Sequence, residues 1–167
     1  MIRAQDKCLS AQYLEEIGPF CDLLRQAHAK TAIEVGAGEC GTALLILAAM
    51  GYGGLVISVD LPEPHGTALK WENEALGAVG PGQTWKLVRG HSRDEKTVEA
   101  VAAELVDRKA DLLFVDAEHT EEAALGDYRA YGRFLQPLGM TAFHDICYHK
   151  LWPMWNHLRG SVRVNRS

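Results

Sequence analysis

The chain has 167 residues, of which 47% are hydrophobic and 23% are charged. This balance is that of an ordinary globular protein, and the length suits one domain over residues 1–167 rather than two. The formal net charge of −5 argues against general binding to nucleic acid. The longest apolar run is too short to cross a bilayer and the first residues have no apolar leader, so we expect a cytoplasmic protein with no membrane partner.

The predicted secondary structure is a helical segment followed by strands that alternate with helices. Residues 10–29 carry apolar side chains at three- and four-residue steps, which is typical of a helix, with Gly18-Pro19 as its break or kink. The expected strands are 31–35, 55–59, 84–88, 111–115 and 140–144, and the expected helices between them are 41–50, 66–76, 93–109 and 121–135. This alternation predicts an α/β fold with an open, doubly wound and mostly parallel sheet.

A glycine-rich turn follows the first expected strand. Residues 34–41 read Glu-Val-Gly-Ala-Gly-Glu-Cys-Gly, which contains the spacing G-x-G-x-x-G between a strand and a helix. Glycine allows the backbone to turn tightly and to approach a ligand, and the start of the helix offers free N–H groups. We therefore expect Gly36, Ala37, Gly38 and Gly41 to bind a cofactor. The motif alone does not identify that cofactor, because nicotinamide enzymes, flavoproteins and methyltransferases share it.

Three residues near the ends of the expected strands narrow the choice of cofactor. Glu34 lies two positions before the first glycine; a dinucleotide site usually has an apolar residue there, whereas an acid can hold the ammonium group of S-adenosylmethionine. Asp60 ends the second expected strand and can accept hydrogen bonds from ribose hydroxyls. Ser92 follows the third expected strand, where a loop would contact adenine. The structural alternative is a glycine turn with acidic residues at the surface.

Acidic and histidine residues follow the fourth and fifth expected strands. Asp116 and His119 come after the fourth strand, and His144 and Asp145 come at the end of the fifth. Because parallel strands end at the same edge of a sheet, these side chains should meet in one crevice. Carboxylates would suit Mg²⁺ or Mn²⁺, and imidazoles would also allow Fe²⁺, Co²⁺ or Zn²⁺. Each residue also has a structural interpretation: a helix cap or turn for the aspartates, and surface or half-buried positions for the histidines, His149 included.

Four segments, in this order, resemble the class I methyltransferases, which bind S-adenosylmethionine. They are 33–38 (Ile-Glu-Val-Gly-Ala-Gly), 59–60 (Val-Asp), 111–119 (Asp-Leu-Leu-Phe-Val-Asp-Ala-Glu-His) and 134–145, which ends in Phe-His-Asp. The chain is most similar to the methyltransferase 24 group. That group is related to the metal-dependent O-methyltransferases of catechols, caffeoyl-CoA and macrolide sugars, and to cephalosporin hydroxylase-like proteins. The resemblance spans the core from residue 30 to 150 and implies a Rossmann-like, class I methyltransferase fold.

The resemblance also implies roles for individual residues. In the metal-dependent relatives, the acid after strand four and a polar pair after strand five hold the cation, which corresponds here to Asp116, His144 and Asp145. In the macrolide-sugar relatives, a histidine three residues after that acid is the base, and His119 matches its position. The pair of His144 and Asp145 departs from the two acids or the Asp-Asn pair of those relatives. This departure leaves open whether a metal binds and which metal it is.

The sequence as a whole predicts methyl transfer from S-adenosylmethionine to a hydroxyl of a small-molecule acceptor, with the help of a divalent cation. Asp116 is expected to serve the cofactor, the cation and the reaction, and His119 is expected to take the hydroxyl proton. Three alternatives stay open. They are a module that binds S-adenosylmethionine without catalysis, an NAD(P)-binding oxidoreductase, and a metal-dependent hydroxylase or hydrolase.

Residues 151–167 form a tail whose role the sequence leaves open. The relatives continue into a final antiparallel strand pair, and here only residues 161–164 could supply such a strand. A sheet edge left open in this way would invite pairing with a second copy of the chain, as a homodimer. Residues 151–155 (Leu-Trp-Pro-Met-Trp) either pack on the core as part of a terminal helix or form an apolar wall over the acceptor.

Overall fold

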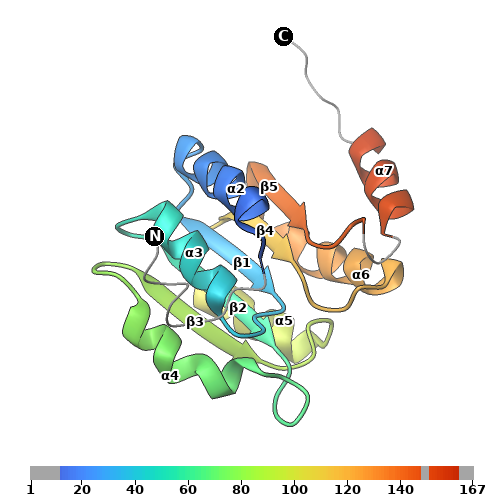
Figure 1. Cartoon of the computed structure of the whole chain (residues 1–167). Helices are drawn as coiled ribbons and strands as arrows, with labels where there is room; N and C mark the ends of the chain where they lie inside the picture. The colour runs from blue at the N-terminus through green and yellow to red at the C-terminus, as the bar shows by residue number, and fades with distance from the viewer. Residues whose placement is uncertain (1–11, 148–150, 162–167) are drawn as a thin grey trace.

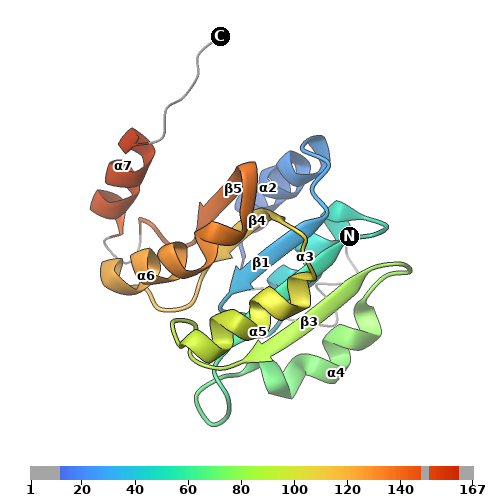
Figure 2. The same ribbon diagram turned by 180° about the vertical axis from the view of Figure 1, so that it is seen from behind.

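The computed structural model describes residues 12–147 and 151–161, which form a parallel sheet between two layers of helices (Figures 1 and 2). The strands are β1 (Thr31–Val35), β2 (Leu55–Asp60), β3 (Thr84–Arg89), β4 (Ala110–Val115) and β5 (Leu135–Phe143). Their order across the sheet is β3-β2-β1-β4-β5. From β1 the chain adds β2 and β3 on one side, and it then crosses to the other side of β1 to add β4 and β5. The direction of winding therefore reverses between β1 and β4.

The helices cover both faces of this sheet. They are α2 (Leu14–Gln26), α3 (Gly41–Met50), α4 (Ala68–Ala78), α5 (Glu95–Leu105), α6 (Glu121–Tyr131) and α7 (Trp152–Ser161), with a 3-10 turn at Gly132–Phe134. Helices α2, α3 and α4 lie on the face seen in Figure 1, and α5 and α6 lie on the opposite face, seen in Figure 2. Within the described part of the chain, none of the helices is long and apolar enough to cross a membrane.

The central strand shows why the sequence folds in this way. All five residues of β1 are buried, and its three apolar side chains divide between two apolar cores. Ala32 belongs to the core beneath α2, α3 and α4, whereas Ile33 and Val35 belong to the core beneath α5 and α6. A strand that is covered on both faces must be apolar on both faces, which is the pattern of a parallel sheet. The structure therefore confirms the predicted α/β class and its doubly wound, parallel sheet.

The last strand differs from the prediction. β5 begins at Leu135 rather than at Met140, and it ends at Phe143, one residue before His144. Ala110 of β4 pairs with Leu135, but Leu112 pairs with Met140, so the segment between them bulges out of the ladder. Leu138 in this bulge has a φ of 70° and is 99% exposed. Residues that look like a turn in the sequence are thus accommodated inside a strand.

Two helix predictions also need correction. Helix α2 runs through Gly18 and Pro19, so the predicted break is wrong, whereas a kink at this point stays a prediction. The carbonyl that loses its partner to Pro19 belongs to Glu15, an exposed residue, so water can take the missing bond. The expected helix 93–109 is shorter, because α5 ends before Val106 and Asp107, both of which have positive φ.

The described part of the tail, residues 151–161, contains helix α7 and packs on the core. Leu151 and Met154 are buried in the core on the α5–α6 face, and Trp152 is 47% exposed. This result supports the packed alternative for residues 151–155. Ser161 ends α7, whereas residues 162–164 of the expected strand, and His149, lie outside the described residues. Pairing of the outer edge of β5 with a second copy stays a prediction.

Candidate active site

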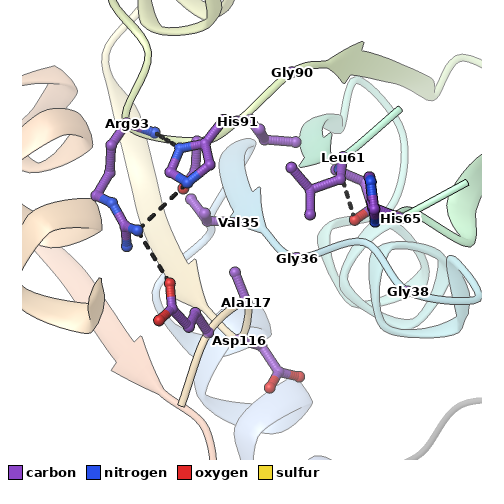
Figure 3. Close-up of a pocket in the computed structure, with 14 residues that line it drawn as sticks. Val35, Gly36, Gly38, Leu61, His65, Gly90, His91, Arg93, Asp116 and Ala117 are labelled. Carbon is purple, nitrogen blue, oxygen red and sulfur yellow. Dashed lines mark hydrogen bonds and ion pairs between the residues drawn. The ribbon is translucent and has the colours of Figure 1, made fainter. Parts of the chain in front are cut away.

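A pocket of about 420 Å³ opens at the carboxyl ends of the central strands (Figure 3). It lies where the winding of the sheet reverses, which is where open α/β sheets bind their ligands. Among the predicted cofactor residues, the pocket is lined by Gly36, Gly38, Asp60, Ser92 and Asp116. The other three, Glu34, Ala37 and Gly41, do not line it and are buried beside it in β1, the turn and the start of α3.

The first glycine of the turn is held tightly between two strands. The Gly36 amide donates a hydrogen bond to the Val59 carbonyl at 2.9 Å, and the Asp116 amide donates to the Val35 carbonyl at 2.8 Å. Gly36 has a φ of 96°, and a Cβ at this position would lie 2.3 Å from the backbone oxygen of Asp116. Gly38 has a φ of 50° but has open space around it. Of these two glycines, it is therefore Gly36 that combines an unusual backbone conformation with a close approach to backbone that cannot move aside.

Replacement of Gly36 by alanine should destabilise the protein by about 3 kcal/mol, because the new methyl group adds steric overlap to the strain of a positive φ. The matched control is Gly38→Ala, which should cost only the conformational strain of about 1 kcal/mol. Urea unfolding of both variants measures the difference. Equal losses for the two variants would contradict the close approach of Gly36 to Asp116.

Glu34 is a buried carboxyl in the centre of the sheet. Its side chain has no exposure to solvent. Its Oε2 accepts a hydrogen bond from the Ser58 hydroxyl at 2.5 Å, and that hydroxyl accepts one from the Trp85 indole at 2.9 Å. Its Oε1 has no hydrogen-bond partner. Burial raises the pKa of Glu34 to about 8, the bond from Ser58 opposes that rise, and the charges of Asp116 and Asp60 add to it.

Asp60 is fixed in place on the rim of the pocket. Its Oδ1 accepts a hydrogen bond from the Leu61 amide at 2.9 Å, and its Oδ2 accepts one from the Ala68 amide, at the start of α4, at 3.0 Å. Each carboxylate oxygen can accept a further bond. The side chain is therefore oriented before a ligand arrives, with acceptor capacity left for hydroxyl groups.

The loop between β3 and α5 closes one side of the pocket, and residues that the sequence did not single out hold it there. The Ser92 hydroxyl donates to Asp127 of α6 at 2.6 Å, and the Tyr131 hydroxyl donates to the Ser92 carbonyl at 2.6 Å. Arg93 forms an ion pair with Glu118 at 3.0 Å (Figure 3). The only signal in the sequence is that Asp127 and Tyr131 fall four residues apart on one helix, which is too common to indicate a site.

Four ionisable side chains meet beside the pocket, as the positions of the strands predicted. Nδ1 of His144 lies 3.1 Å from Asp116 Oδ1 and 3.3 Å from Asp145 Oδ1. Nε2 of His119 lies 3.3 Å from Asp116 Oδ1 and 3.4 Å from Asp145 Oδ2. One ligand atom from each residue fits within 4.8 Å of the other three. We call these four residues, Asp116, His119, His144 and Asp145, the cation cluster.

The donor set of the cation cluster fits a divalent metal ion. His144 Nδ1 is buried and makes no hydrogen bond, although two carboxylates lie close to it. Its interaction with Asp116 raises the pKa of His144, and burial opposes that rise. Asp145 has a φ of 53°, a conformation that aspartate adopts more readily than most residues. A cation at this point would satisfy the free imidazole nitrogen and both negative charges at once.

The fold and the site together define a Rossmann-like domain of the class I methyltransferase type. A sequence model of the methyltransferase 24 family, described as "Methyltransferase domain", matches residues 33–146. The chain belongs to this family.

Named relatives agree with this family but are longer. A "Putative O-methyltransferase" from Mycobacterium sp. (strain KMS) is 31% identical over 60% of this chain and 42% of its own length. Another, from Mycobacterium leprae (strain TN), is 29% identical over 77% of this chain and 53% of its own length. The chain thus spans about half the length of the curated relatives it matches.

A solved structure shows the same fold. The O-methyltransferase TomG from Streptomyces achromogenes, in complex with SAM, has a TM-score of 0.62 and 14% identity, over 96% of this chain and 76% of that one. At this level of identity the similarity concerns the fold alone.

Proposed function

We propose that this chain binds S-adenosylmethionine in the 420 Å³ pocket and transfers its methyl group to a hydroxyl oxygen of a small-molecule acceptor. One observation carries the proposal: Asp116 lines the pocket and also belongs to the cation cluster. A methyl donor in the pocket and a hydroxyl held by a cation would therefore meet at a single residue. The relatives named as O-methyltransferases and the solved neighbour in complex with SAM support this proposal.

The cofactor would lie along the carboxyl edge of the sheet. The turn at Gly36 and Gly38 admits close approach of a ligand to the backbone, and Asp60 would accept hydrogen bonds from the ribose hydroxyls. Ser92 would contact the adenine. Glu34 remains the predicted contact of the ammonium group; its unpartnered, buried Oε1 supports this role, although the residue does not line the pocket.

The reaction places few chemical demands on the protein, because the methyl carbon is already activated by the sulfonium. The protein must bring the acceptor oxygen, the carbon and the leaving sulfur into line. A bound cation would lower the pKa of the acceptor hydroxyl and orient it. Nε2 of His119 lies at the cation cluster and can take the proton as the oxygen–carbon bond forms and the carbon–sulfur bond breaks. The products are the methylated acceptor and S-adenosylhomocysteine.

The cation cluster offers two carboxylates and two imidazoles, and these ligands favour some cations over others. Mg²⁺ prefers oxygen ligands, whereas Mn²⁺ accepts carboxylates and tolerates imidazole nitrogen. Asp116, His144 and Asp145 would hold the ion, which leaves His119 as the base. Of the two predicted ions, we therefore expect Mn²⁺ to bind more tightly than Mg²⁺.

Calorimetric titration of EDTA-treated protein should show micromolar binding of S-adenosylmethionine and no binding of NAD⁺, each measured with and without Mn²⁺. Asp60→Ala should weaken the binding of S-adenosylmethionine by roughly tenfold to a hundredfold, because it removes a charged acceptor for the ribose hydroxyls. The matched control is Asp22→Ala, which removes an exposed carboxylate of α2 that does not line the pocket.

Each outcome of this titration points to a different function. No binding of S-adenosylmethionine, with or without the metal, would refute the proposal. Binding of NAD⁺ in its place would favour an oxidoreductase. Binding of S-adenosylmethionine without release of S-adenosylhomocysteine across a panel of hydroxyl acceptors would favour a module that binds the cofactor without catalysis.

A further inference from the structure

The loop between β3 and α5 is fastened to α6 by contacts that the proposed reaction does not use. Asp127 and Tyr131 are both completely buried, and both bind Ser92, one through its hydroxyl and the other through its carbonyl. The loop also packs closely on the helix, since a Cβ on Gly126 would lie 2.7 Å from Cδ of Arg93. The position of Ser92 in the pocket wall is therefore set by α6.

The hydrogen bond to Asp127 also fixes what the Ser92 hydroxyl can offer to a ligand. A serine hydroxyl has one hydrogen to donate and can accept two bonds, whereas a carboxylate can only accept. The single hydrogen of Ser92 is given to Asp127 Oδ1 at 2.6 Å. Ser92 lines the pocket, and a ligand that reaches its hydroxyl oxygen can therefore only donate a hydrogen bond to it.

The order of strands indicates which part of the cofactor lies near this oxygen. The glycine turn follows β1, Asp60 ends β2, and Ser92 follows β3, and these three strands lie side by side in the sheet. A ligand that passes the turn and sets its ribose on Asp60 would place its base at the β3–α5 loop. This placement rests on the proposed function.

We propose that Asp127, acting through Ser92, selects the purine base of the cofactor. An oxygen that can only accept a hydrogen bond favours adenine, whose exocyclic amino group donates. It disfavours hypoxanthine, which has a carbonyl oxygen at the same position. Asp127 is thus a positioning residue that determines specificity without touching the ligand. Tyr131 holds the backbone of the loop and does not affect the direction of the hydroxyl.

The test compares the affinity of the protein for S-adenosylhomocysteine with its affinity for S-inosylhomocysteine. Titrations are made at pH 8, because burial raises the pKa of Asp127 and the carboxylate form is required. The wild-type protein should prefer the adenosyl compound by roughly tenfold to a hundredfold. In Asp127→Ala the hydroxyl is free to rotate and can donate to a carbonyl, so the ratio of the two affinities should fall at least tenfold.

Two further variants separate selection from a merely structural role. Ser92→Ala, which keeps the fold of the loop but has no hydroxyl, should also lose the preference. Tyr131→Phe removes only the bond to the Ser92 carbonyl, so it should weaken both ligands by the same factor and leave their ratio unchanged. Thermal unfolding of each variant shows that it is folded before it is titrated.

The outcomes distinguish this inference from the proposed function. If the wild-type protein binds neither compound, the proposed function fails and the inference fails with it. If the wild-type protein binds S-adenosylhomocysteine but has no preference for adenine, or if Asp127→Ala and Ser92→Ala keep the wild-type ratio, only the selection of the base is overturned.

Discussion

Glu34 should lower the free energy of unfolding of the ligand-free protein as the pH rises from 4.5 to about 8. Burial raises the pKa of Glu34 from 4.5 to about 8, so the folded protein keeps a proton that the unfolded chain releases. The contribution of this group to stability is therefore complete below pH 4.5 and is lost as the pH rises through this window. The limiting slope is about 1.4 kcal/mol per pH unit.

Glu34→Gln is the variant that isolates this effect. Its amide oxygen can still accept the bond from Ser58, and it has no proton to lose. Urea unfolding between pH 5 and pH 8.5 should give a flatter curve for the variant, which becomes more stable than the wild-type protein at pH 8 by several kcal/mol. The exposed control Glu74→Gln on α4 should keep the wild-type slope.

The comparison between variants matters more than the wild-type curve alone. The pKa values of Asp127 and His144 are also raised, by burial in the first case and by Asp116 in the second, so both groups change stability in the same direction as Glu34. Only the difference in the free energy of unfolding between Glu34→Gln and the wild-type protein reports on the ionisation of Glu34. Parallel curves for these two proteins would contradict the raised pKa.

The sequence was sufficient to predict which residues share the edge of the sheet. Asp116 and His144 are 28 residues apart in the chain, yet each follows a parallel strand, and neighbouring parallel strands end together. Their side chains accordingly lie 3.1 Å apart at the nearest atoms. The prediction needed only the order of strands and the residues that follow them, not the details of packing.

Contacts that depend on the path of a loop could not be predicted in this way. Asp127 and Tyr131 occupy ordinary positions on a helix, and their partner Ser92 is 35 and 39 residues away. No feature of the nearby sequence shows that α6 lies against that loop.

The bulge around Leu138 was missed for a related reason. Pro137 and Gly139 are typical of a turn, and only the pairing with β4 shows that the strand continues through them.

Asp116→Asn should abolish turnover, by about a thousandfold or more, while the affinity for S-adenosylmethionine changes little. Oδ1 of Asp116 lies near both imidazoles of the cation cluster, so asparagine would replace an anionic ligand of the cation by a weaker, neutral one and would remove the counter-charge for His119 when that residue takes the proton. Cofactor affinity should persist, because the contacts of residue 116 with Val35 and Gly36 are made by its backbone. Release of S-adenosylhomocysteine measures turnover whatever the acceptor is.

Three measurements on this variant separate the two roles of Asp116. Titration with Mn²⁺ should show a loss of at least a hundredfold in metal affinity, whereas titration with S-adenosylmethionine should stay within about threefold of the wild-type protein. Asp107→Asn makes the same chemical change at an exposed position and should alter none of the three. Retained turnover in Asp116→Asn would remove the cation from the mechanism. Parallel loss of turnover and cofactor affinity would instead show that the side chain of Asp116 contributes to cofactor binding, and the loss of turnover could then not be assigned to the cation.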